Sequence, residues 1–107
     1  MKKKAIIISL SGYTLTKKEI DLFKIYLPWG VILFRRNIKN FKQLKNLVLS
    51  IKKITKEKFY PILIDEEGGD VSRLQNIINN RTFSQRFFGN LYDTNSKIGI
   101  SLYKNYI

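Results

Sequence analysis

The chain has 107 residues, a formal net charge of +12, and neither cysteine nor histidine. This length predicts one domain at most, or a piece of a larger one, and the hydrophobic fraction of 44% is that of a folded protein. Without cysteine there is no disulfide or thiolate metal site, and without histidine no imidazole acid or base. The apolar stretch at residues 5–10 is too short for a secretory signal or a membrane span, which predicts a cytoplasmic protein with no membrane partner.

The positive charge permits an alternative function, a small basic nucleic-acid-binding module. Most of the basic residues are lysines, however, and arginine, which makes bidentate phosphate and base contacts, is scarce. Five lysines of the second expected helix cluster opposite its apolar stripe: Lys42, Lys45, Lys52, Lys53 and Lys56. We therefore interpret the charge as solvated helix faces and predict no nucleic-acid partner.

Three short apolar runs at residues 5–8, 31–34 and 61–64 predict β-strands separated by helices. Each run is continuously apolar, which is typical of strands covered on both faces. The first helix is expected to begin after Thr16, with Glu19 completing a capping box, and to end at Pro28-Trp29-Gly30. The second is expected to begin with Asn40 as its N-cap and with Gln43 reaching back to it. The resulting βαβαβ order predicts an α/β fold with a parallel sheet.

The last third of the sequence has a weaker pattern. Residues 75–86 are polar and without strong periodicity, which predicts a loop or a broken helix. A final helix is expected from about residue 93 or 94, with Asp93 as its N-cap and Ile98, Leu102 and Tyr106 on one face. The sequence stops inside this pattern, so we expect a partial chain.

The most informative segment is Asp65-Glu66-Glu67-Gly68-Gly69, which directly follows the third apolar run. Side chains at the ends of parallel strands are commonly aimed at ligands. If strand geometry continued, Asp65 and Glu67 would share one side and Glu66 would take the other. Two interpretations stay open from these residues alone: ligand binding by Asp65, or carboxylates that accept hydrogen bonds at a loop. The spacing matches no metal motif, and we predict no metal and no cofactor.

Three segments together resemble a known family. Residues 61–74 (PILIDEEGGDVSRL) resemble its I-D-Q-E-G-G-R-V-x-R-L segment, residues 33–37 (LFRRN) resemble the end of its second barrel strand, and residues 11–16 (SGYTLT) fit the turn after its first strand. In this order they resemble the amino-terminal part of glycoside hydrolase family 3, specifically the bacterial β-N-acetylhexosaminidases.

This resemblance implies the first three units of an incomplete (β/α)₈ TIM barrel, with residues 1–107 as its amino-terminal portion. It implies a retaining hydrolase that removes terminal β-linked N-acetylglucosamine during muropeptide recycling in the cytoplasm. Carried over by position, Asp65 and Arg73 would bind the sugar. Five other residues would shape the site, with a structural role expected first for the last two: Glu67, Gly68, Gly69, Arg36 and Asn37.

Several features depart from the family pattern. Glu66 stands where glutamine or threonine is usual, and Asp70 replaces a usual arginine. The family's histidine acid/base and aspartate nucleophile lie on later barrel loops, so the resemblance places no catalytic residue here. We expect this chain alone to have no turnover. A remaining alternative is a non-enzymatic remnant that binds sugar weakly or associates with a partner, and the sequence does not define an oligomeric state.

Overall fold

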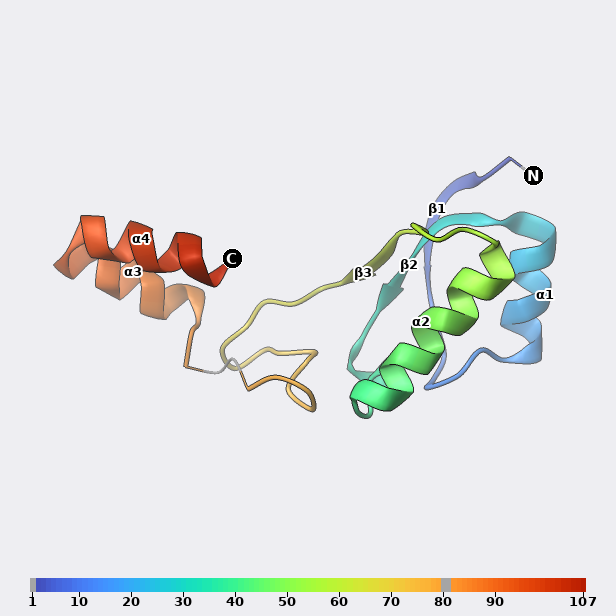
Figure 1. Cartoon of the computed structure of the whole chain (residues 1–107), viewed down its shortest axis with the longest axis horizontal. Helices are drawn as coiled ribbons and strands as arrows, with labels where there is room; N and C mark the ends of the chain where they lie inside the picture. The colour runs from blue at the N-terminus through green and yellow to red at the C-terminus, as the bar shows by residue number, and fades with distance from the viewer. Residues whose placement is uncertain (1, 80–81) are drawn as a thin grey trace. The chain divides into compact units, whose positions relative to one another are not determined.

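The computed structural model describes residues 2–79 and 82–107 of the chain. The chain divides into two compact units, Met1–Asp65 and Glu66–Ile107. The first contains a β-sheet with helices, and the second contains a long loop and a pair of helices (Figure 1).

The first unit follows the predicted order of strands and helices. Its elements are β1 (Lys4–Ser9), α1 (Lys17–Tyr26), β2 (Pro28–Leu33), the 3₁₀ turn η1 (Arg35–Asn37), α2 (Phe41–Thr55) and β3 (Ile62–Ile64). The strands form one sheet in the order β1-β2-β3, and both pairings are parallel. The α/β class and the parallel βαβαβ arrangement predicted from the sequence are therefore confirmed.

The helix starts of this unit are those that the sequence predicts. The Thr16 hydroxyl accepts the Glu19 backbone N–H at 3.2 Å, and the Glu19 carboxylate accepts the Thr16 N–H at 2.7 Å, which completes the capping box. The Asn40 side chain accepts the Gln43 N–H at 2.9 Å at the start of α2. The start predicted for β2 was three residues late, because Pro28, which donates no N–H, is tolerated as the first residue of the strand.

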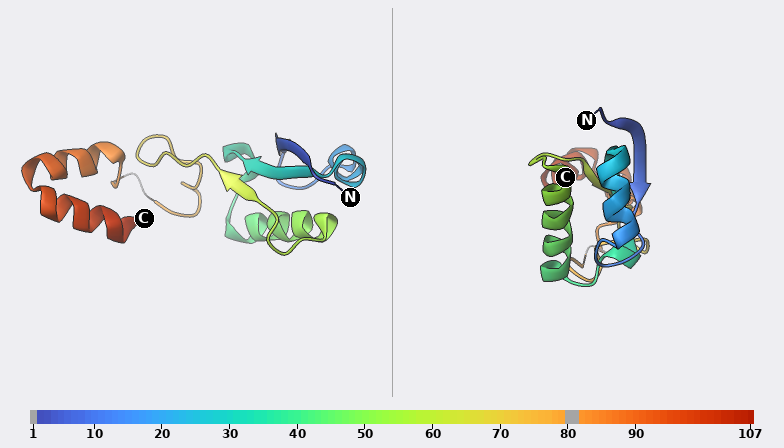
Figure 2. Two further views of the ribbon diagram at one scale, coloured as in Figure 1. Left: turned by 90° about the horizontal axis from the view of Figure 1, so that it is seen from above. Right: turned by 90° about the vertical axis from the view of Figure 1, so that its right-hand side faces the viewer.

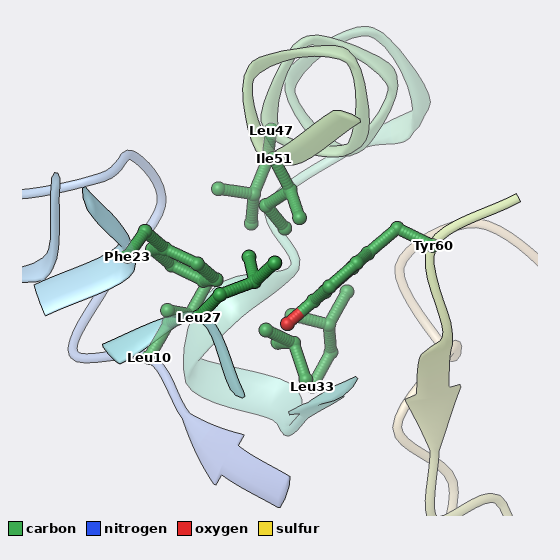
Figure 3. Packing of buried hydrophobic residues seen from close by; sticks show 8 residues of the cluster. Leu10, Phe23, Leu27, Leu33, Leu47, Ile51 and Tyr60 are labelled. Carbon is green, nitrogen blue, oxygen red and sulfur yellow. The ribbon is translucent and has the colours of Figure 1, made fainter. Parts of the chain in front are cut away.

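The core of the first unit lies between the sheet and the two helices. Phe23 of α1 and Leu47 and Ile51 of α2 point toward one another and toward Leu33 of β2 (Figure 3). The two helices lie side by side (Figure 2). Tyr60 closes the core from the segment before β3, with its ring edge toward Phe23 and its hydroxyl donating to the Pro28 carbonyl at 2.7 Å. These contacts anchor β3 and thereby the residues that follow it.

The prediction that the strands are covered on both faces is wrong for one face of this sheet. Both crossovers run in the same direction along the sheet, so right-handed connections place α1 and α2 on the same face. Val31 and Leu33 are fully buried on that face. On the other face Ile7 keeps 45% and Leu63 keeps 37% of its surface exposed. Within the first unit, this second face of the sheet is apolar and is covered by neither helix.

The second unit ends in two helices, α3 (Gln85–Thr94) and α4 (Ser96–Tyr106), which pack side by side (Figures 1 and 2). The sequence predicted only the later helix and placed Asp93 at its N-cap, which is wrong because Asp93 lies in the last turn of α3. Ser84 caps α3, and Asn95 caps α4 by accepting the Ile98 N–H at 3.2 Å. The predicted loop at 75–86 is confirmed for 75–79 and 82–84, whereas residues 80 and 81 lie outside the described residues.

Gly99 explains why the two helices approach closely. A Cβ atom at this position would lie 2.8 Å from the Tyr92 Cα atom, so only glycine permits the contact. None of the helices in the described part of the chain is long and apolar enough to span a bilayer.

Candidate functional site

The carboxyl ends of the three strands meet at one edge of the sheet in the first unit. Each strand is followed directly by a residue at this edge: Leu10 after β1, Phe34 after β2 and Asp65 after β3. Because the strands are parallel and Leu33 pairs with Ile64, these positions form one rim. In open and closed α/β sheets this edge is where ligands bind.

Asn37 holds two of the rim segments together. It is fully buried, and its amide nitrogen donates to the carbonyls of Leu10 at 3.0 Å and Gly12 at 2.8 Å. Its amide oxygen accepts the Phe34 N–H at 2.9 Å. These contacts satisfy both ends of the amide and fix the loop after β1 to the turn after β2.

Arg36 contacts the same backbone as Asn37. Its Nε atom donates to the Leu10 carbonyl at 2.9 Å, and its guanidinium lies 4.9 Å from the centre of the Phe34 ring. Both residues of this rim segment therefore shape the edge on which Asp65 lies.

Gln43 also belongs to the rim, a role that was not predicted from the sequence. Its Nε2 donates to the carbonyls of Tyr13 at 2.8 Å and Asn37 at 3.0 Å, and its oxygen accepts the Lys39 N–H at 2.7 Å. It thus links α2 to both rim loops. The sequence signal was its position three residues after the N-cap, which predicted only a local contact.

Glu19 ties the loop after β1 to α1. Its Oε1 accepts the Ser11 N–H at 2.8 Å, while its Oε2 accepts from Thr16. Partial burial tends to raise the pKa of Glu19, but the hydrogen bonds from Thr16 and Ser11 outweigh it, and the pKa is lowered. The carboxylate form is therefore stabilised in this loop.

Asp65 is the last residue of the first unit and is exposed at the rim. β3 ends at Ile64, so the condition for the predicted alternation is not met; Glu67 is also exposed, and Glu66 is half-buried. An exposed carboxylate at this edge can accept hydrogen bonds from the hydroxyls of a ligand. Arg73, the other predicted sugar-binding residue, belongs to the second unit.

Glu66 organises the loop of the second unit. Its Oε2 accepts the backbone N–H groups of Arg73 at 2.8 Å and Leu74 at 2.9 Å, and the Ser72 hydroxyl at 3.3 Å. Its Oε1 accepts the Gly68 N–H at 3.0 Å. For Glu66, the interpretation of a carboxylate that accepts hydrogen bonds at a loop is therefore confirmed. The sequence reasoning treated this residue as a mild family variation and gave it no role.

The two glycines of the loop have backbone conformations that other residues rarely adopt. Gly68 has a φ angle of 76° and Gly69 one of 59°. The Gly68 carbonyl accepts the Val71 N–H at 3.3 Å, so the chain reverses here. A Cβ atom on Gly69 would lie 2.7 Å from the Cβ atom of Ser84. Both glycines are thus needed for the turn that returns the chain to Glu66.

A cavity of about 200 Å³ borders this loop within the second unit. It is lined on one side by Glu66, Glu67 and Gly68, and on the other by aromatic side chains that include Phe88, Tyr103 and Tyr106. Among residues 2–79 and 82–107, no group of three or more acidic side chains gathers closely enough to hold a metal ion.

Comparisons with known proteins give one consistent class. The chain is 37% identical over 70 residues to a β-hexosaminidase of Histophilus somni and 39% identical over 70 residues to that of Glaesserella parasuis. Each match covers 65% of this chain and 20% of the relative, so the chain spans about a fifth of the length of these proteins. No protein-family model matches the chain.

Solved structures agree with the sequence relatives. The fold is similar to NagZ from Neisseria gonorrhoeae in complex with N-trifluoroacetyl-D-glucosamine, with a TM-score of 0.72, 32% identity, and coverage of 86% of this chain and 26% of that one. The native form of the same protein matches with a TM-score of 0.59 and 36% identity over 66% of this chain and 20% of that one. The resemblance to bacterial β-N-acetylhexosaminidases predicted from the sequence is confirmed, and the similarity is to an amino-terminal part of such proteins.

Proposed function

We propose that this chain forms the amino-terminal part of a retaining β-N-acetylhexosaminidase and supplies residues that bind the terminal N-acetylglucosamine. The observation that carries the proposal is the position of Asp65. It stands at the carboxyl edge of a parallel sheet whose sequence and fold are similar to an enzyme solved with an N-acylated glucosamine. The substrate class is a saccharide that contains N-acetylglucosamine, and the cellular role is the recycling of cell-wall fragments in the cytoplasm.

The chemistry of the two proposed residues suits this ligand. A carboxylate can accept hydrogen bonds from two sugar hydroxyls, and a guanidinium can donate to sugar oxygens in a fixed planar geometry. Asp65 supplies the first group and Arg73 the second. Both contacts orient the sugar and do not carry out bond cleavage.

The open face of the sheet supports a barrel as the complete fold. Ile7 and Leu63 are apolar and partly exposed on the face opposite α1 and α2. In a (β/α)₈ barrel this face is the interior, where side chains from the other strands would cover it. We therefore propose that residues 1–107 supply the first strands of such a barrel, and that the acid/base and the nucleophile lie in the rest of it.

A chimera tests the proposal. The 107 residues replace the matching amino-terminal segment of the Histophilus somni β-hexosaminidase, and the product is assayed on a chromogenic β-N-acetylglucosaminide. We expect the chimera to cleave the substrate and the 107-residue chain alone to be inactive, because the chain contains no histidine acid/base.

Two outcomes would contradict the proposal. The first is a folded chimera, with a cooperative thermal transition like that of the parent enzyme, that cleaves no substrate. The second is turnover by the 107-residue chain itself, since that would place catalytic groups where none is proposed. The relative without its amino-terminal fifth serves as the inactive control.

A further inference from the structure

We propose that Glu66 is the positioning residue of this site, and that its carboxylate holds Arg73 in place for sugar binding. The inference rests on the proposed function and deepens it. It begins from the contacts within the second unit, where one half-buried side chain accepts hydrogen bonds from Gly68, Ser72, Arg73 and Leu74.

These contacts span the whole loop. Gly68 is two residues after Glu66, whereas Leu74 is eight residues after it. Gly68 and Gly69 have positive φ angles, and the chain reverses its direction at these two residues. The far end of the loop, at Arg73 and Leu74, therefore returns to the carboxylate. Glu66 thus closes a ring of backbone around the turn, and Arg73 is one of the two residues whose N–H groups it holds most closely.

The four hydrogen bonds that Glu66 accepts are best satisfied by the ionised form of its side chain. Oε1 accepts one N–H and Oε2 accepts two N–H groups and a hydroxyl. A carboxylate offers acceptors on both oxygens, whereas the amide of a glutamine offers one acceptor and one donor group. A glutamine at position 66 could therefore keep the contacts at one oxygen but not those at the other. Hydrogen bonds to an ionised acceptor are also stronger than those between neutral groups.

Burial separates Glu66 from its acidic neighbours. Asp65 and Glu67 are exposed, while Glu66 is half-buried and Ser72, which it contacts, is only 4% exposed. The side chain therefore faces its own loop, and its role toward a ligand is indirect. Arg73 is the residue through which it acts, because Arg73 is the one member of the ring proposed to contact the sugar.

Amide hydrogen exchange on the full 107-residue chain tests the structural half of the inference. In Glu66→Ala we expect the protection of the Arg73 and Leu74 N–H groups to fall by about 10- to 100-fold, as expected for loss of charge-assisted hydrogen bonds. Glu66→Gln should retain part of it. Asp70→Asn, which removes the same charge from an exposed position of the loop, should change little.

The amides of Val31 and Ile51 in the first unit provide an internal control for folding. Unchanged protection of Arg73 and Leu74 in Glu66→Ala would overturn the inference. A loss that is equally large in Asp70→Asn would overturn it as well, because the effect would then come from the charge of the loop.

A double-mutant cycle in the active chimera tests the functional half. Glu66→Ala should lower the affinity for N-acetylglucosamine by about tenfold or more when Arg73 is present, and should have little further effect in an Arg73→Ala background. Glu66→Gln should recover part of the affinity. Equal losses in both backgrounds would show a merely structural role and overturn the inference while leaving the proposed function intact. A chimera that folds but neither binds the sugar nor cleaves the substrate would overturn both.

Discussion

The two units fix their loops in different ways. In the first, the rim is held by a fully buried amide, that of Asn37, against a closed apolar core of sheet and helices. In the second, the loop from residue 66 to 74 is held by one half-buried carboxylate and two glycines with positive φ. The rim therefore shares the stability of a core, whereas the loop depends on a few individual residues.

The largest effect is expected at Asn37. Asn37→Ala removes three hydrogen bonds and leaves part-buried backbone groups of Phe34 and Gly12 without the Asn37 partner, which should cost about 2–4 kcal/mol of unfolding free energy. Urea denaturation followed by circular dichroism measures it. Asn46→Ala on the exposed face of α2 is the matched control. A loss below about 0.5 kcal/mol would contradict the stabilising role of Asn37, because the rim would then not depend on the buried amide.

The next effect is expected at the turn of the second unit. Gly69→Ala would place a Cβ atom on a residue with a positive φ angle, at 2.7 Å from the Cβ atom of Ser84. This substitution should lower the local unfolding free energy of the loop by about 1–3 kcal/mol. Gly89→Ala is a useful control of opposite sign, since space is open there and alanine favours the helix by up to about 1 kcal/mol. Hydrogen exchange of residues 66–79 measures the effect of Gly69→Ala, and hydrogen exchange of the α3 amides measures that of Gly89→Ala. If Gly69→Ala instead destabilised the amides of β2, the two units would not be independent.

A smaller effect is expected in the core of the first unit. Tyr60→Phe removes the hydrogen bond to the Pro28 carbonyl and should cost about 1 kcal/mol at neutral pH. Thermal denaturation measures this cost. Tyr26→Phe, at an exposed position, is the control.

The same tyrosine predicts a pH dependence. Burial, together with the nearby charge of Glu57, raises the pKa of Tyr60 to about 12. An unfolded tyrosine ionises near pH 10, so the unfolded state loses its proton first and wild-type stability should fall as the pH rises from about 10 to about 12. The Tyr60→Phe variant should lack this component. Parallel pH curves for the two proteins would contradict the burial of this hydroxyl.

The smallest effect is expected at Glu19. Glu19→Gln weakens the contacts to Ser11 and Thr16 and should lower the free energy of unfolding by about 0.5 kcal/mol near neutral pH. Because the pKa of Glu19 is lowered in the folded state, its contribution is present above the ordinary value of 4.5 and is lost as the pH falls through the lowered pKa. The wild-type and Glu19→Gln stabilities should therefore converge in acid. Asp21→Asn, which removes an exposed carboxylate from the same helix, is the control.

Much of the first unit could be predicted from its sequence because local signals agree there. The capping box of α1, the N-cap of α2, the apolar runs and the strand-helix rhythm all indicate the same βαβαβ order, and all are local. The exposure of Ile7 and Leu63 could not be predicted, since it depends on which face the crossovers cover and on what other strands are present. The boundary of β2 was shifted because a proline was interpreted only as a helix stop.

The second unit was harder to predict for a physical reason. Helix α3 contains two adjacent phenylalanines followed by Gly89, which weaken its local propensity. Its stability comes from packing against α4 through contacts such as Phe88 with Tyr103. The role of Glu66 arises from residues two to eight positions away in an irregular loop. The family pattern located Asp65 and Arg73, but it did not point to the residue that holds the backbone of Arg73.

The proposed binding of the sugar by Asp65 is tested most directly by kcat/KM of the chimera on a chromogenic β-N-acetylglucosaminide. The Asp65→Asn variant of the chimera is compared with its Asp70→Asn variant. Loss of an ionised acceptor for two sugar hydroxyls should lower kcat/KM by about 100-fold or more. The Asp70→Asn control should stay within about twofold of the parent chimera. An Asp65→Asn chimera as active as its parent would contradict the assignment of this carboxylate to the sugar.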